Sequence, residues 1–455
     1  MHRWNPGRTY LSYKRFRKTG QFNASPPLLL AIGFLTLIAL GTVLLSLPIS
    51  TREPVSLFQA LFTAVSAVTV TGLTLVNVST TFTHFGQVII ALLVQIGGLG
   101  FVTFAVIAVR TMGKKISLQQ QALALEAFNQ TSLAKVQRTA FAIFKITAVI
   151  EVVGAIILTL RWWPGSNFID ALSRALFHTV MAFNNSGFAL QTTQLSLYVS
   201  DPVTILTTTL LIILGGIGFS VLSDVSGMRR WSKLAPYTRL AILVTLALNL
   251  AGFVLLWMLE YNNYATLGTL SLHGQALAAW LQSVSSRTAG FSSINIGQLS
   301  DSSKLVIIIL MFIGGGSLST ASGIKIGTFA VLVAAARSYI FQRSEVVLMR
   351  RSVSPDTVQK ALALLLVTIG LALISVLLIT VFDHAPFIDI VFEVVTALST
   401  TGMSNGLTAH LSVPSQSLII ILMFAGRLGP LTLIYSLATQ SRSRIRYAET
   451  EIQVG

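Results

Sequence analysis

The sequence contains no cysteine and few charged residues. Without cysteine the chain cannot form disulfide bonds, thiolate metal sites or a cysteine nucleophile. Its six histidines are scattered without metal-ligand spacing, and it has no Walker-type phosphate loop. Charged residues make up 10% of the chain, whereas soluble domains contain about 25%. These absences argue against an enzyme, including an ATPase.

Long apolar runs dominate the chain instead. Hydrophobic residues account for 53% of it, and the mean hydropathy is +0.76. Several runs contain about 20 apolar residues, the length that crosses the hydrocarbon core of a bilayer. The first run begins at Leu28; it is too long for a signal-peptide core and lacks a small-residue cleavage site, so we expect it to be retained. The sequence therefore predicts an integral membrane protein.

The net charge of +16 is concentrated in a few places. Most lysines and arginines lie before residue 27, in the segments 110–138, 229–239 and 337–360, and from Arg442 onward. If the apolar spans alternate in direction, all five places lie on one side of the membrane, and the positive-inside rule makes that side the cytoplasm. We therefore expect both termini in the cytoplasm. The basic segments are expected to set the topology and to contact anionic lipid, not nucleic acid.

One short signature recurs four times, each time between two apolar runs. Small or polar residues lead into one glycine, which a large apolar residue follows. The signature glycines are Gly72, Gly187, Gly290 and Gly402. A second landmark follows each signature at a nearly constant offset, a glycine cluster in the next apolar run: Gly97-Gly98-Leu99-Gly100, Gly215-Gly216-Ile217-Gly218, Gly314-Gly315-Gly316 and Gly426-Arg427-Leu428-Gly429. Two landmarks in register indicate an internal repeat of about a quarter of the chain.

Each repeat combines a membrane span, a shorter helix, the signature and a second span. The expected spans are 28–49, 88–109, 140–160, 203–222, 240–259, 305–336, 361–382 and 418–438, and the expected half-helices are 54–65, 168–181, 273–285 and 388–398. The half-helices are too short to cross a bilayer, so a re-entrant pore helix fits better. We therefore predict an all-α membrane protein with four helix–pore-helix–helix repeats around a central pore, eight transmembrane helices and four re-entrant pore helices.

This architecture divides the chain into nine consecutive segments. They are a cytoplasmic basic arm (1–26), repeat 1 (27–110), a cytoplasmic loop (111–138), repeat 2 (139–224), a second loop (225–238), repeat 3 (239–336), a third loop (337–359), repeat 4 (360–440) and a cytoplasmic tail (441–455). Connections on the signature side are short and carry few charges. No separate soluble domain is expected.

The apolar run 305–336 breaks the pattern, because one helix of that length would measure about 48 Å against a hydrocarbon core of about 30 Å. Its centre, 314–323, consists almost entirely of glycine, serine and threonine. We expect a broken helix there, and irregular backbone at membrane depth is tolerated only where it is buried in protein or lines a water-filled path. A second interruption is expected at Gly426-Arg427-Leu428-Gly429-Pro430.

The repeated unit suggests how the chain could bind a cation. Four short helices that point their C-termini at one axis would place partial negative charge there and favour a cation. The segments after them would present backbone carbonyls to a dehydrated ion, and a glycine permits the dihedral angles that this requires. The alternative is that the signature glycines only allow close helix packing. Packing is the favoured interpretation for the second set of glycines.

Together these features resemble the Trk/Ktr/HKT superfamily of potassium transporters, most closely its bacterial KtrB-type membrane subunits. The resemblance rests on the four signatures, the repeated helix–pore-helix–helix unit and the Gly/Ser/Thr break, and it covers residues from about 27 to 440. It implies potassium uptake across the bacterial cytoplasmic (inner) membrane. It also implies a homodimer with one pore in each protomer, docked on a cytosolic nucleotide-binding regulatory ring (KtrA-like). No cofactor is expected in this chain.

The resemblance implies roles for individual residues. The selectivity filter would consist of Val70, Thr71, Gly72, Asn185, Ser186, Gly187, Thr288, Ala289, Gly290, Thr400, Thr401 and Gly402, with potassium at their backbone carbonyls. The gate would consist of Gly314, Gly315, Gly316, Ser317, Ser319, Thr320, Ser322 and Gly323, together with Arg427. Glycine at position 72 favours potassium, since a serine there accompanies sodium preference in plant members. Whether sodium is cotransported or only modulates the flux stays open.

Four basic residues near the expected path need separate interpretation. Arg427 is expected to hold loop carbonyls across the path and to discourage cations from standing there. Its alternative role is structural pairing with Glu151, Asp224 or Glu393. Lys325 is expected at the cytoplasmic edge of the loop, and Arg174 and Arg287 are expected to brace the filter.

Two other classes of protein compete with an ion-conducting subunit. An alternating-access secondary cation transporter also uses broken helices, but its breaks should come in pairs at corresponding positions of two halves. Here a four-fold signature dominates. A membrane-embedded enzyme would need a metal motif, paired aspartates or a nucleophile and base, and the sequence shows none of these.

Overall fold

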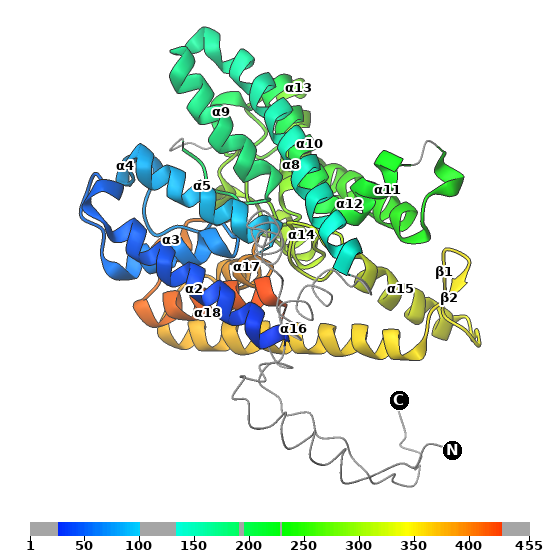
Figure 1. The fold of residues 1–455 in the computed structure, drawn as a ribbon. Coiled ribbons are helices and arrows are strands. Elements are labelled where there is room, and N and C mark those ends of the chain that lie inside the picture. Colours follow the sequence, from blue (N-terminus) through cyan, green and yellow to red (C-terminus); the bar gives the residue numbers. More distant parts are fainter. Residues whose placement is uncertain (1–25, 101–132, 191–194, 228–229, 430–455) are drawn as a thin grey trace, which may run out of the picture.

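The structure of the protein, a computed structural model, is a bundle in which long helices alternate with short ones (Figure 1). It describes residues 26–100, 133–190, 195–227 and 230–429. The predicted basic arm and tail, most of the predicted loop 111–138, and the last parts of the first and fourth repeats lie outside the described residues.

Four long helices begin the four predicted repeats. They are α2 (Pro26–Ser46), α8 (Leu133–Trp162), α12 (Pro236–Glu260) and α16 (Pro355–Phe382). Both α12 and α16 carry proline in their first turn, where its missing N–H is not needed. Among the described residues, three helical segments are long and apolar enough to cross a membrane: Ala140–Gly165, Pro236–Glu260 and Pro355–Phe382. The apolar helices predicted at 140–160, 240–259 and 361–382 are therefore confirmed.

A helix of only 12 to 16 residues follows each long one. These short helices are α3 (Leu57–Val68), α9 (Phe168–Phe183), α13 (Leu272–Ser285) and α17 (Phe387–Leu398). Ser56 begins α3 through a capping box with Gln59, and the Ser271 side chain caps α13 in a similar way. The short helices predicted from the sequence are present, and each end lies within one turn of the predicted position.

A third helix in each repeat ends at the glycine cluster. These helices are α5 (His84–Leu99), α10 (Pro202–Ile217), α14 (Asp301–Phe312) and α18 (Val413–Leu428). After three of them comes a glycine with positive φ, Gly100 at 86°, Gly218 at 111° and Gly429 at 86°. Such a residue ends a helix. The prediction of one continuous span over 203–222 is therefore wrong, because the chain bends by 98° at Gly218 into α11 (Phe219–Gly227).

The long apolar run of the third repeat is also interrupted, as predicted. Helix α14 ends at Phe312, and α15 (Ile326–Ile340) begins after a non-helical segment. We call this segment, residues 313–325, the loop segment. It contains the whole Gly/Ser/Thr-rich stretch 314–323, whose weak helix propensity explains why the helix does not continue.

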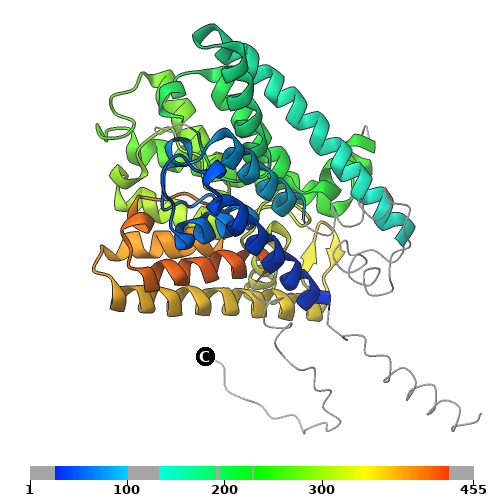
Figure 2. The ribbon, with the colours of Figure 1, turned by 60° about the vertical axis from the view of Figure 1, so that its left-hand side comes forward.

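One type of contact, used four times, closes the repeats into a ring. The third helix of each repeat packs on the short helix of the next: α5 on α9, α10 on α13, α14 on α17, and α18 back on α3. Figure 2 shows the result, since helices of the first repeat (blue) and the fourth (orange) lie next to each other although they come from opposite ends of the chain. This cyclic order brings the four signatures toward a common centre.

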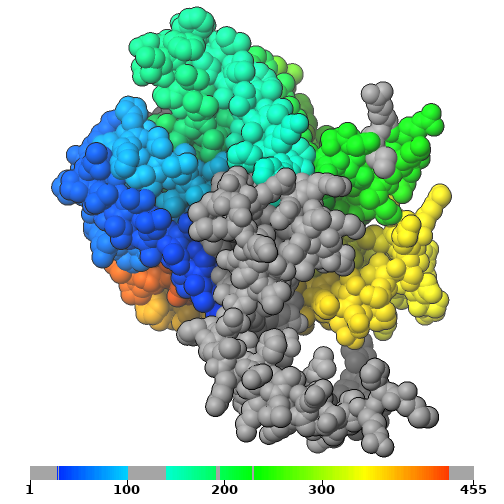
Figure 3. All heavy atoms as spheres, in the orientation of Figure 1, coloured from blue at the N-terminus to red at the C-terminus, as the bar shows by residue number. Residues whose placement is uncertain are grey.

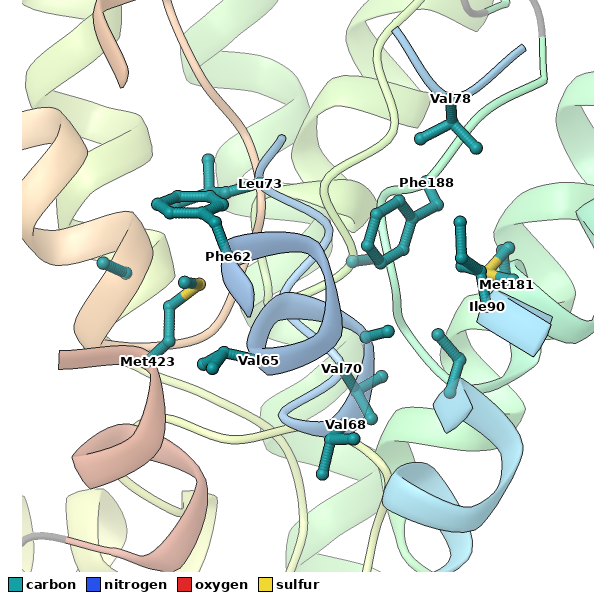
Figure 4. Packing of buried hydrophobic residues seen from close by; sticks show 14 of the residues in the cluster. Phe62, Val65, Val68, Val70, Leu73, Val78, Ile90, Met181, Phe188 and Met423 are labelled. Atoms are coloured by element: carbon teal, nitrogen blue, oxygen red, sulfur yellow. The ribbon is translucent and has the colours of Figure 1, made fainter. Parts of the chain in front are cut away.

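Apolar side chains around the short helices form the core. In Figure 4, Phe62 and Val65 of α3 lie beside Met423 of α18, and Ile90 of α5 lies beside Met181 of α9. All five side chains are buried. The outward faces of α8 and α16 instead expose leucine, isoleucine and valine, as expected of a surface that faces lipid.

The remaining elements are short. They are η1 (Pro48–Ser50), α4 (Val78–Thr81), η2 (Trp163–Gly165), η3 (Ser196–Tyr198), η4 (Trp231–Lys233), η5 (Ile296–Gln298), η6 (Leu407–His410), β1 (Val347–Leu348) and β2 (Arg351–Ser352). The two strands pair antiparallel after α15 and project from the edge of the molecule (Figures 1 and 3). This hairpin lies in the predicted loop 337–359 and departs from an all-α fold.

Candidate functional site

The chain leaves each short helix through the same unusual turn. Two residues before each signature glycine, a non-glycine residue has positive φ: Val70 at 60°, Asn185 at 57°, Thr288 at 73° and Thr400 at 48°. Such a conformation is costly for side-chain-bearing residues, above all for β-branched ones, and it concentrates at functional sites. All four repeats thus share one strained backbone geometry at equivalent positions.

Backbone hydrogen bonds fix this turn. In three repeats the N–H just before the signature glycine donates to the carbonyl five residues earlier: Thr71 to Ser66, Ser186 to Met181 and Thr401 to Thr396, each at 2.8 Å. In the third repeat both Ala289 and Gly290 donate to Ser285, at 2.9 and 3.2 Å. The turn is therefore tied to the end of its own short helix, and the signature residues follow from there.

The four signature glycines meet around one axis. A Cβ atom added to Gly72 would lie 2.5 Å from the backbone nitrogen of Gly187, and one added to Gly187 would lie 2.9 Å from the Cα of Gly290. A Cβ on Gly290 would lie 3.0 Å from the carbonyl carbon of Gly402, and one on Gly402 would lie 3.1 Å from the Cα of Gly72. Cβ atoms almost never come within 3.0 Å of backbone and rarely within 3.4 Å, so these residues, which we call the glycine ring, leave little room for side chains.

Hydroxyl groups beside the glycine ring are engaged in two repeats, whereas those of Ser186 and Thr288 have no hydrogen-bond partner among the described residues. Thr71 Oγ1 bonds Thr69 Oγ1 at 2.8 Å, and Thr401 Oγ1 bonds Ser399 Oγ at 2.7 Å. A cavity of about 320 Å³ opens onto the ring and is lined by Gly72 and Gly187. The hydroxyls of Thr71 and Thr401 are thus held within their own repeats.

The second set of glycines packs against the ends of the short helices. An added Cβ at Gly97 would overlap the carbonyl oxygen of Val68. In the same way, one at Gly215 would overlap that of Phe183, and one at Gly426 that of Leu398. Each carbonyl belongs to one of the last residues of the short helix in the same repeat. These contacts support the packing interpretation for the first, second and fourth clusters, whereas Gly314 in the third packs on Ser322 instead.

The loop segment docks onto the second repeat. Gly316 N–H donates to the carbonyl of Gly216 at 2.8 Å, and Thr320 N–H donates to that of Gly215 at 3.3 Å. The Thr320 hydroxyl donates to the carbonyl of Phe183, the last residue of α9, at 3.2 Å. The predicted gate residues therefore lie directly next to the end of a short helix and close to the glycine ring.

Arg427 joins the loop segment to two further repeats. Its Nη1 donates to the Thr320 carbonyl at 2.5 Å and to Ser322 Oγ at 3.4 Å. Its Nη2 donates to the Gly98 carbonyl at 3.1 Å and to the Gly97 carbonyl. One guanidinium thus links the third repeat to the first from a position in the fourth, and the planar fork of arginine suits such bridging.

The acidic residues considered as alternative partners of Arg427 have other partners. Glu151 accepts from Gln95 and Asn184, and the Asp224 carboxylate accepts from the Ala235 N–H. Glu393 accepts from Ser404, Asn405 and Thr408. Within the described residues, Arg427 bonds only to loop and inner-helix oxygens. Structural pairing with a carboxylate is therefore not the arrangement found.

Arg287 and Arg174 differ in what they contact. Arg287 is buried, and its Nη2 donates to the Gly314 carbonyl at 2.9 Å, so it ties the third signature to the loop segment. The expectation that Arg174 braces the filter is wrong: its guanidinium donates to Ser166 Oγ at 2.7 Å and to the Asp170 carbonyl, at the opposite end of α9. Side chains of a helix tilt toward its N-terminus, which explains why Arg174 contacts this end.

Two further contacts of the loop segment bear on the predictions. The Tyr237 hydroxyl accepts from the Ser317 N–H at 2.6 Å, a contact that the sequence did not indicate because 80 residues separate the two. Lys325, the last residue of the loop segment, donates from Nζ to the Ala321 carbonyl at 2.5 Å within the same segment. No group of three or more acidic or histidine side chains that could hold a metal ion occurs in the described part of the chain.

Comparison with known proteins gives a consistent result. Residues 13–444 match the TrkH family of cation transport proteins. The chain is 43% identical to the Ktr system potassium uptake protein B of Bacillus subtilis (strain 168), covering 95% of this chain and 97% of that protein. It is 39% identical to the protein of the same name from Vibrio alginolyticus, covering 96% of this chain and 97% of that protein. It is 34% identical to the potassium/sodium uptake protein NtpJ of Enterococcus hirae, covering 97% of this chain and 99% of that protein.

A solved structure supports the fold. The crystal structure of the potassium transporter TrkH from Vibrio parahaemolyticus matches with a TM-score of 0.71 and 18% sequence identity, over 92% of this chain and 86% of that one. The helical ring thus has the same overall fold as that structure. Together with the match along nearly the whole sequence, this shows that the chain belongs to the TrkH family of cation transport proteins.

Proposed function

We propose that the chain takes up potassium across the bacterial cytoplasmic membrane as the ion-conducting subunit of a Ktr-type system. The observation that carries the proposal is the glycine ring, formed by Gly72, Gly187, Gly290 and Gly402 after four turns that each contain a positive φ two residues before the glycine. The names of the relatives from B. subtilis and V. alginolyticus support potassium as the ion. The described helices would belong to eight transmembrane spans and four re-entrant pore helices, with both termini in the cytoplasm.

The glycine ring acts as the selectivity filter in this proposal. The short helices end beside it, so their C-terminal partial charges favour a cation. Backbone carbonyls of the signature residues replace the hydration shell of the ion, while the hydroxyls of Thr71 and Thr401 stay bonded in their own repeats. Glycine is needed because a side chain would fill the space in which neighbouring segments meet.

The loop segment acts as the gate. It bonds to Gly215 and Gly216 of the second repeat and to Arg427 of the fourth, so it crosses between repeats instead of lining only its own. A neutral hydrogen bond contributes about 0.5–1.5 kcal/mol and one to a charged group about 1.5–3 kcal/mol. A few such bonds hold the segment in place, and a modest input can release it.

A cytosolic regulator supplies that input. The Ktr system names of two relatives indicate a system of several components, and a nucleotide-binding ring (KtrA-like) below a homodimer fits the proposal. Helix α15 follows the loop segment directly and leads into the exposed hairpin of β1 and β2. A pull on this region would be transmitted along α15 to the loop segment.

Ion flux into liposomes that contain only the purified chain tests the proposal. We expect potassium and rubidium to permeate more rapidly than sodium, and deletion of residues 317–322 to raise the potassium flux severalfold. Gly370→Ala serves as a control, because nothing lies within 4 Å of the added Cβ. Absence of potassium flux in both the wild type and the deletion variant would refute the filter, and an unchanged flux in a folded deletion variant would refute the gate. Flux that saturates with fixed coupling to sodium would point to alternating access instead.

A further inference from the structure

A second cavity, of about 630 Å³, lies between α5, α8 and α9. The described residues that line it include none from the glycine ring. Several apolar side chains at its wall are exposed, among them Val88, Leu92 and Ile169, with exposed fractions of 56%, 57% and 70%. The cavity therefore opens on the lipid-facing surface, and its size suits a small organic molecule.

Polar groups gather on one part of the cavity wall. Glu151 accepts from Gln95 Nε2 at 3.1 Å and from Asn184 Nδ2 at 3.3 Å. One helical turn before Glu151, Thr147 is 1% exposed, lines the same cavity, and has a hydroxyl without a hydrogen-bond partner among the described residues. A buried hydroxyl is costly to leave unpaired, so this wall can still accept or donate a bond to a ligand.

The charge of the cavity contrasts with that of the chain. The protein has 31 lysines and arginines against 15 acidic residues, yet the described residues that line the cavity include Glu151 and Asp170 and, apart from His84, no basic side chain. Neither carboxylate takes part in the ion pairs found within the described ranges. Phe144 and Phe177 also line the cavity, and aromatic rings attract organic cations.

From these observations we infer that the cavity is a binding site for amphiphilic organic cations, specifically alkylammonium ions that enter from the bilayer. The ammonium group donates hydrogen bonds to Glu151 and Thr147, and the hydrocarbon chain lies along Val88 and Leu92 of α5. From Val88 to Gln95 this helix rises about 10 Å, similar to an extended alkyl chain of decylamine length. A hydrated metal cation does not fit as well, because most of the wall is apolar.

The site adjoins the conduction machinery without belonging to it. Asn184, which donates to Glu151, directly follows the last residue of α9 and precedes Asn185, the residue with positive φ in the second signature. A bound ammonium would compete with Asn184 for the carboxylate. The site is defined by binding alone, so its test does not depend on whether the chain conducts potassium.

Photolabelling tests the inference. The full-length chain in nanodiscs of neutral phospholipid is labelled with a diazirine derivative of decylamine at neutral pH, and the labelled peptides are identified by mass spectrometry. We expect saturable labelling of the cavity-lining parts of α5 and α8 that decylamine suppresses and neutral 1-decanol does not. Glu151→Gln keeps the shape and an acceptor oxygen but loses the charge, and it should weaken the competition by decylamine about tenfold, since bonds to charged groups are the stronger ones.

Two variants of adjacent residues separate the cavity from the general lipid surface. Ala148→Trp would fill the cavity and should abolish saturable labelling, whereas Val149→Trp, at a position 55% exposed and outside the cavity lining, should leave it unchanged. Labelling that does not saturate, or that 1-decanol suppresses as well as decylamine does, would overturn the inference and indicate a lipid chain in the cavity. If Ala148→Trp does not fold, the comparison of Glu151→Gln with the wild type decides alone.

Discussion

The guanidinium of Arg427 donates to the Thr320 carbonyl at 2.5 Å, although 107 residues separate the two in the sequence. The same side chain reaches the carbonyls of Gly97 and Gly98, so it holds oxygens of two other repeats at once. We expect Arg427→Ala to raise potassium flux in regulator-free liposomes about tenfold, because at least one charge-assisted bond of about 1.5–3 kcal/mol is lost.

A lysine at position 427 distinguishes the effect of the positive charge from the effect of bonding two sets of carbonyls at once. Arg427→Lys keeps the positive charge, but a single ammonium cannot span two sets of carbonyls as a planar fork does. We expect flux between that of the wild type and that of Arg427→Ala. A lysine variant that stays as closed as the wild type would show that repulsion of cations, not bridging, limits the flux.

Crowding in the glycine ring can be measured separately from backbone strain. Gly402 and Gly406 have similar positive φ angles of 78° and 96°, but only an added Cβ at Gly402 meets the neighbouring repeat, while Gly406 has open space. Gly402→Ala should lower potassium flux or its preference over sodium about tenfold or more. Gly406→Ala should cost about 1 kcal/mol of stability from strain and leave selectivity intact. Equal ion selectivity in both variants would contradict the role of the ring.

Glu393 should stabilise the segment that follows the fourth signature. Its buried carboxylate accepts from Ser404 Oγ at 2.6 Å, from the Asn405 N–H at 3.1 Å and from Thr408. Glu393→Ala leaves these donors unpaired, at about 1–3 kcal/mol each, so we expect a clearly lower midpoint of thermal unfolding in detergent. Glu345→Ala, which removes an exposed side chain, should leave the midpoint unchanged. A similar midpoint in both variants would show that water replaces the carboxylate.

Asp383, just outside the helix α16, gives the stability a pH dependence. Burial alone would raise the pKa of Asp383, but hydrogen bonds from Ser415 and Ser412 outweigh it and hold the pKa below its usual value of 3.8. Because the folded pKa is the lower one, this stabilisation is complete above about pH 4 and is lost as the pH falls through the folded value. Asp383→Asn should therefore lose less stability than the wild type on acidification below pH 4, as thermal unfolding at a series of pH values can show.

The absence of cysteine allows a direct test of topology. A single cysteine at Ser344, in the basic loop after α15, should react with an impermeant reagent only after the cells are opened, because positive loops are retained in the cytoplasm. Tyr264→Cys is the matched control, since Tyr264 is 79% exposed beyond the opposite end of α12. Labelling of the cysteine at position 344 in intact cells would reverse the predicted orientation.

Local signals made much of the fold predictable from the sequence. The short helices were predictable because each is an apolar segment too short to span a bilayer that ends before a glycine signature, and the break near Gly314 because a run of small and polar residues does not favour a helix. The register of the repeats followed from glycine spacing alone. The bend at Gly218 was missed because the surrounding sequence is as apolar as that of a continuous span.

Side-chain partners were less predictable, because they depend on packing between repeats. Arg287 and Tyr237 both bond to the loop segment from elements far away in the sequence, and nothing in their local sequence indicates this. Arg174 was expected at the filter, but side chains of a helix tilt toward its N-terminus, and its guanidinium bonds to Ser166 and Asp170 on that side. The bonds between Glu151, Gln95 and Asn184 join α8, α5 and the residue after α9, which come together only because the repeats pack in a ring.

Because one polypeptide supplies all four quarters of the ring, each quarter can differ from the others. Arg427 stands in the fourth glycine cluster where the first has Gly98, and only the third repeat carries the loop segment. In a channel built from four identical chains, every substitution enters four times and any gate inherits four-fold symmetry. Here a single substitution alters one quadrant, so under the proposed function selectivity and gating could change independently, and movement of the one loop segment would be enough to open the path.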